Sequence, residues 1–108
     1  MAIDEIPKRT TLALDAIRQL FGTQDGEFST TLFVEHHMEE IPPSYWQTHL
    51  GTEKPEPAAV LGLLALTSRW GDGDVENFDF SLPGKVTNYV ISVHFDGDGN
   101  IDDISMES

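Results

Sequence analysis

The sequence of 108 residues contains no cysteine, which excludes disulfide bonds and thiolate metal sites. It also lacks any run of about 18 apolar residues, the length that a helix needs to cross a membrane. The N-terminal stretch MAIDEIPKRT carries acids and a proline where a signal peptide would have an apolar segment. These absences predict a cytoplasmic protein that is not embedded in a membrane.

Basic residues are scarce, since 6 Lys and Arg stand against 19 Asp and Glu and give a formal net charge of −13. Such a field repels nucleic acid and anionic membranes, because both are bound through cationic side chains. It attracts cations and basic proteins, although acids can also serve solubility alone. Between Trp70 and Ser108 the only base is Lys85. This asymmetry of charge along the chain indicates an interaction surface.

The length and the 39% of hydrophobic residues predict a single domain over residues 1–108 with one core. Apolar residues recur at three- and four-residue spacing after Thr10, and apolar and polar residues alternate after Glu27. A nearly continuous apolar run follows Pro57 and predicts a helix that is buried on most sides. The elements expected from these patterns are a helix over 10–22, a strand over 27–40, a short helix over 43–51 and a helix over 58–70.

Three further strands are predicted from the segments VENFDFSLP, VTNYVISVHF and NIDDISMES, which the turns LPGK and DGDGN connect. Consecutive strands with short turns form an antiparallel meander. The expected fold is therefore α+β, with a four-strand, mostly antiparallel sheet. One strand precedes the three-strand C-terminal meander, and three helices pack on one face of the sheet.

The acidic segment VHFDGDGNIDD, residues 93–103, could be a calcium loop or a β-hairpin. A calcium-binding helix–loop–helix needs glycine at loop position 6 and a bidentate glutamate at position 12. If Gly99 takes position 6, Ser105 falls at position 12; if the loop starts at Asp96, Ile101 replaces the glycine. We therefore predict a hairpin turn, because glycine and asparagine supply the positive φ of tight turns. A weak cation site on Asp96, Asp98 and Asp102 stays open.

The segment EHHMEE, residues 35–40, has the composition of a metal site. In a strand, however, His36 and His37 would point to opposite faces and could not bind one ion together. The sequence also has no nucleophile elbow, phosphate-binding loop or paired-glycine fingerprint. We therefore expect a protein without a metal, without a cofactor and without enzymatic activity.

The alternation within the strands predicts which side chains face away from the helices. That outer face would carry five carboxylates and no Lys or Arg, whereas solvated faces usually mix both signs. Like charges on one face repel each other, and a basic partner would relieve the repulsion. The predicted partner-binding residues are Glu35, His37, Glu39, Asp79, His94, Asp103 and Glu107.

In its hairpin sequence VHFDGDGNIDDIS, its size and its acidity, the chain resembles the small acidic immunity proteins of bacterial toxin systems. Residues 75–108 also resemble the C-terminal strands of an uncharacterised bacterial family. The resemblance implies a cytoplasmic protein that binds and blocks a basic nuclease-type toxin. We expect the chain to be a monomer or a weak dimer. It brings no catalytic residues with it. Two alternatives are a nucleic-acid mimic that inhibits a DNA-binding protein and a small metal-dependent enzyme.

Overall fold

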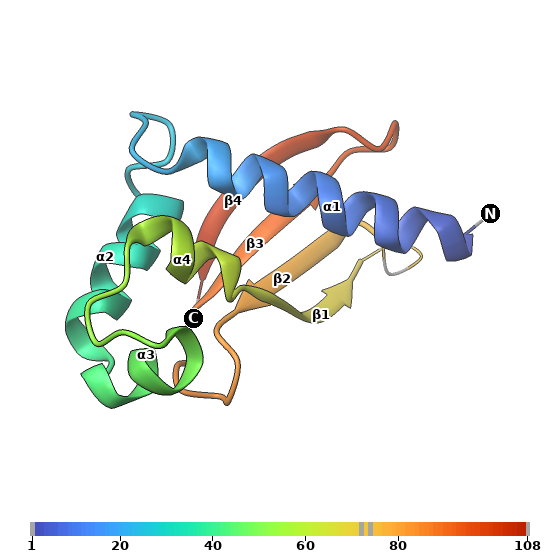
Figure 1. Ribbon diagram of the computed structural model, residues 1–108. Helices are drawn as coiled ribbons and strands as arrows, with labels where there is room; N and C mark the ends of the chain where they lie inside the picture. Colours follow the sequence, from blue (N-terminus) through green and yellow to red (C-terminus); the bar gives the residue numbers. More distant parts are fainter. Residues whose placement is uncertain (1, 72, 74, 108) are drawn as a thin grey trace.

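The computed structural model describes residues 2–71, 73 and 75–107, and within them four helices precede four strands (Figure 1). The helices are α1 (Ala2–Leu20), α2 (Thr30–Glu40), α3 (Pro43–Leu50) and α4 (Pro57–Gly62). The strands are β1 (Ala65–Trp70), β2 (Asn77–Ser81), β3 (Val90–Phe95) and β4 (Ile101–Glu107). No helix in the described ranges is long and apolar enough to cross a membrane.

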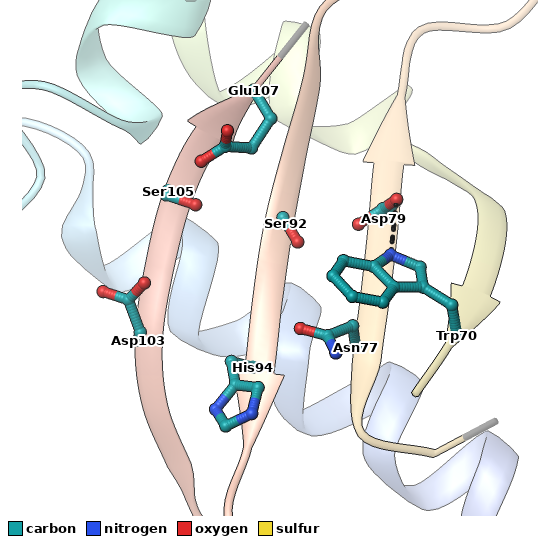
Figure 2. Close-up of a pocket in the computed structure, with 8 residues that line it drawn as sticks. All are labelled: Trp70, Asn77, Asp79, Ser92, His94, Asp103, Ser105 and Glu107. Carbon is teal, nitrogen blue, oxygen red and sulfur yellow. Dashed lines mark hydrogen bonds between the residues drawn. The ribbon is translucent and has the colours of Figure 1, made fainter. Parts of the chain in front are cut away.

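The four strands form one antiparallel sheet in the order β1-β2-β3-β4, so each strand pairs with the next one in the chain. Helices α1 and α4 lie across one face of this sheet (Figure 1). The described residues that line a pocket on the opposite face all belong to the strands (Figure 2). This arrangement confirms the predicted α+β class and the antiparallel meander.

The strand predicted over 27–40 is wrong, because this segment forms helix α2. Its buried side chains recur at helical spacing, and the alternation of apolar residues that favoured a strand is coincidental. Leu32 and Phe28 belong to the alternating apolar set, yet both are exposed. A helix buries one stripe and not every second residue. The buried stripe comprises Thr30, Phe33, Val34, His37 and Ile41.

The helix predicted over 58–70 is wrong in its second half. Helix α4 ends at Gly62, and the chain continues as the edge strand β1 from Ala65. Glycine is a poor helix former, and the β-branched Thr67 favours a strand. An apolar run cannot by itself separate a buried helix from a buried strand. The sheet keeps four strands because β1 takes the place of the strand that was predicted over 27–40.

The remaining elements are close to those predicted. Helix α1 ends at Leu20, two residues before the predicted Gly22, and it starts at Ala2, eight residues before the predicted Thr10, and includes Pro7. Helix α3 begins with Pro43 and is terminated by Gly51, whose φ of 74° places it in the left-handed region. Glycine adopts this conformation without the steric cost that other residues have.

The core lies between the helices and the covered face of the sheet. Alternate residues of the two central strands supply most of the sheet side, and each of them is at most 1% exposed. They pack against Ala13 and Ile17 of α1 and against Phe33 and Val34 of α2. Because side chains alternate along a strand, the residues between them face the open side. The buried strand residues are Phe78, Phe80, Ile91, Val93 and Phe95.

Candidate functional site

The open face of the sheet presents its side chains in rows that run across the strands. Pairing of the backbones sets these rows, because residues opposite each other in register have neighbouring side chains. Each row crosses all four strands, and the two rows are two residues apart along each strand. The first row is Trp70, Asn77, His94 and Asp103, and the second is Ser68, Asp79, Ser92 and Ser105.

These rows enclose a groove of about 450 Å³ on the open face (Figure 2). Small polar side chains form its floor, and longer side chains flank them. Three of the lining residues are carboxylates, and none of the chain's six Lys and Arg is among the described lining residues. The groove is lined by Trp70, Asn77, Asp79, Ser92, His94, Asp103, Ser105 and Glu107.

Four of the seven predicted partner-binding residues meet in this groove, namely Asp79, His94, Asp103 and Glu107. The other three do not, since Glu35, His37 and Glu39 belong to helix α2. Glu35 and Glu39 are exposed on that helix and do not line the groove. His37 is only 1% exposed, so its predicted role on an outer surface is wrong.

His37 has a structural role that its hydrogen bonds define. Its Nδ1 lies 2.6 Å from the carbonyl oxygen of Phe33, and its Nε2 lies 2.8 Å from the hydroxyl of Thr87. A carbonyl oxygen only accepts, so Nδ1 carries the proton and the neutral Nε2 accepts from Thr87. Burial lowers the pKa of His37. The neutral ring therefore ties the loop between β2 and β3 to helix α2.

Asp79 connects β1 and β2 on the open face. Its Oδ2 accepts hydrogen bonds from the indole Nε1 of Trp70 and from the hydroxyl of Ser68, both at 3.0 Å. Its second oxygen, Oδ1, is buried and has no hydrogen-bond partner in the described part of the chain. The first bond fixes the indole ring beside the groove floor, where Trp70 remains 52% exposed. The expectation that Trp70 lies in a buried helix is therefore wrong.

At one end of the groove, the carboxylates of Asp102 and Glu76 lie beside the ring of His94. The Nδ1 atom of His94 is hydrogen-bonded to the carboxylate of Asp102, and its Nε2 lies 3.8 Å from Glu76 Oε2. The hydrogen bond with Asp102 is the main cause of a raised pKa of His94. His94 thus compensates part of the acidity at this end, whereas Asp103 and Glu107 have no ion pair within the described residues.

A β-bulge brings Asp102 to His94. His94 pairs with Asp103 and Phe95 pairs with Ile101, so Asp102 is an extra residue on β4. A bulge turns its additional side chain away from strict alternation. Parity alone places Asp102 on the side opposite Asp103, and this is why the sequence did not reveal its contact with His94.

The loop between β3 and β4 is the predicted hairpin turn. Asp96 Oδ1 accepts hydrogen bonds from the backbone N–H groups of Asp98 and Asn100, at 2.9 and 3.0 Å. These bonds lower the pKa of Asp96, and Gly99 adopts a φ of 83°. The carboxylate thus stabilises the turn itself. No group of three potential metal-ligating side chains is found in the described ranges, which include Asp96, Asp98 and Asp102.

Sequence reasoning missed Trp70 as a site residue because it assigned residues 58–70 to one helix. The alternation of β2, β3 and β4 also directs Asn77, Ser92 and Ser105 to the open face, but small polar residues carry no motif. Comparisons with protein-family models, with curated proteins and with solved structures gave no match to this chain. The resemblance to immunity proteins stays a prediction, and the site is interpreted from its own geometry.

Proposed function

We propose that this chain is a non-enzymatic binding protein whose open sheet face recognises a basic protein. The observation that carries the proposal is the groove with Asp79, Asp103 and Glu107, which has no Lys or Arg among its described lining residues. Like charges held on one face repel each other. Basic side chains of a partner would remove this repulsion and form charge-assisted hydrogen bonds with the carboxylates.

The geometry suits a protein partner. All of the described lining residues of the groove come from the strands (Figure 2), so side chains of a broad surface can approach it from the sheet face opposite the helices. The net charge of −13 adds a long-range attraction for a cationic partner. Such attraction mainly raises the rate of association, and this rate falls as salt screens the charges.

The concrete partner that we propose is a toxin of the nuclease type. A nuclease binds the phosphates of its substrate through Lys and Arg. A cytoplasmic immunity protein would cover those side chains with the carboxylates of the open face and thereby block the substrate. The acidity and size of the chain and its resemblance to immunity proteins support this assignment.

The proposal is tested by comparing two double charge reversals. Asp103→Lys with Glu107→Lys changes the groove, and the control Glu53→Lys with Glu56→Lys changes the exposed segment between α3 and α4 by the same net charge. The ligand is a basic protein captured by the wild-type chain at low ionic strength and then purified. We expect the groove variant to associate at least about tenfold more slowly, while the control changes association by less than about threefold.

Equal slowing in both double variants would show that only the total charge matters and would contradict the proposed face. Failure of the wild-type chain to capture any basic protein would contradict the proposed function as a whole. Circular dichroism of both variants verifies that the charge reversals leave the fold intact.

A further inference from the structure

Ser92 stands at the centre of the groove floor with an unused hydroxyl group. The residue is 8% exposed, lines the groove and points into it between Asp79 and Ser105 (Figure 2). Its side chain makes no hydrogen bond within the described residues, although most buried polar side chains make at least one. Because the Oγ atom itself is still accessible from the groove, a ligand group can form a hydrogen bond with it.

The neighbours of Ser92 define the chemistry of that ligand. Asp79 Oδ1 has no hydrogen-bond partner in the described part of the chain, but it is buried, so it acts on a ligand through its charge and not through direct contact. Asp103 and Glu107 add carboxylates on the β4 side, and the half-exposed indole of Trp70 stands on the β1 side (Figure 2). The groove therefore combines acceptors for several hydrogen bonds with one aromatic face.

We propose that this groove receives an arginine side chain of the basic partner, an inference that rests on the proposed function. A guanidinium group is planar and has five N–H donors in its plane, so it can stack on Trp70 and still donate sideways. The donors would reach Ser92, the indole face would add a cation–π contact, and the carboxylate of Asp103 on β4 would attract the charge from across the groove. The groove volume of about 450 Å³ accommodates one such side chain.

Lysine fits this arrangement less well. Its ammonium group is a compact and strongly hydrated point charge, which approaches a carboxylate but gains less from stacking on an indole. A free small molecule also fits less well, because small-molecule sites bury most of the ligand surface. All of the groove's described lining residues belong to one face of the sheet, and a side chain that is anchored by a surrounding protein surface needs no full enclosure.

The test uses three blocked pentapeptides that differ only in a central arginine, lysine or citrulline, where citrulline is a neutral analogue of arginine. Binding is followed by NMR through the backbone amides of β2 to β4 and the indole N–H of Trp70. We expect the arginine peptide to bind roughly threefold or more tightly than the lysine peptide, and the citrulline peptide to cause no shifts. Agmatine, a small guanidinium compound, is expected to bind more weakly than the arginine peptide.

Variants place the contact in the groove. Asp103→Asn is expected to weaken the arginine peptide roughly fivefold, whereas Glu53→Gln, with the same change in net charge, leaves it unchanged. Ser92→Ala removes a hydroxyl that the folded chain does not use, so it should fold normally and bind the peptide about threefold more weakly. Trp70→Leu should reduce the preference for arginine over lysine.

The outcomes separate this inference from the proposed function. The arginine and lysine peptides could bind equally, with both weakened by Asp103→Asn and neither by Glu53→Gln. In that case the proposed binding role of the acidic face is supported and the arginine assignment is wrong. If agmatine binds more tightly than the peptide, the ligand is a small guanidinium compound and the protein source is wrong. If Glu53→Gln weakens binding as much as Asp103→Asn, or no peptide shifts any groove resonance, both proposals fail.

Discussion

His37 makes the stability of this protein depend on pH in a direction that follows from its surroundings. Burial lowers the pKa of the ring in the folded chain, while the unfolded chain has the ordinary value of about 6.5. The stability that His37 contributes is therefore fully present above about pH 6.5, and it decreases as the pH falls from there toward the folded pKa. Within that window the unfolded state binds the proton that the folded state excludes.

The magnitude can be worked out from the contacts of the ring. Each pH unit within the window removes at most about 1.4 kcal/mol from the free energy of unfolding, because one proton is involved. Replacement of His37 by Phe keeps an aromatic ring but removes the hydrogen bonds with Phe33 and Thr87. At about 1 kcal/mol per bond, we expect the variant to be about 1–2 kcal/mol less stable near neutral pH.

The assay is urea unfolding of the wild-type protein and of His37→Phe, followed by tryptophan fluorescence at several pH values between about 5 and 7.5. Because the other titratable groups are the same in both proteins, the difference between the two free energies of unfolding isolates His37. We expect this difference to shrink as the pH falls and to change sign if the folded pKa lies far below the unfolded one. A difference that stays constant over this range would refute the argument.

Three further predictions concern the open face and its hairpin. Asp79→Ala frees the indole of Trp70, so quenching of its fluorescence by acrylamide should increase; unchanged quenching would mean that packing alone holds the ring. Asp102→Asn should lower the pKa of His94 in an NMR titration, since the hydrogen bond with the Asp102 carboxylate is the main cause of the raised pKa. Asp96→Ala removes the acceptor of two backbone N–H groups and should lower the urea concentration at the midpoint of unfolding.

The C-terminal half of the fold was predictable because its strands are short, because β2 and β3 alternate strictly, and because turns of distinctive composition separate the strands. In such segments the period of two is the only pattern that fits, and Phe78, Phe80, Ile91 and Val93 all lie on the face that it predicts. The hairpin followed from the same local chemistry, with Gly99 at positive φ and Asp96 bonded to the turn backbone.

The segment around α2 was not predictable from periodicity because its sequence fits two periods. Val34 lies in both the alternating set and the helical stripe, whereas Phe33 and His37 are buried only by the helix. Tertiary contacts favour the helix over the strand, since α2 packs against α1, α4 and β4. Local propensity and pattern are weak evidence where a helix and a strand would both bury apolar area. The strand assignment placed Glu35 and Glu39 on the wrong surface.

Four residues of the candidate site were predicted although the first strand was assigned wrongly, and the reason is physical. The parity of β2, β3 and β4 depends on which of their residues face the core, and it is independent of the segment that pairs with the outer edge of β2. Asp79, His94, Asp103 and Glu107 therefore meet in one groove whichever strand stands beside them. The identity of the edge strand decides something different, because β1 contributes the aromatic wall. An acidic face by itself would attract any cation, and the indole of Trp70, fixed by Asp79, is the feature that would favour the flat guanidinium of arginine.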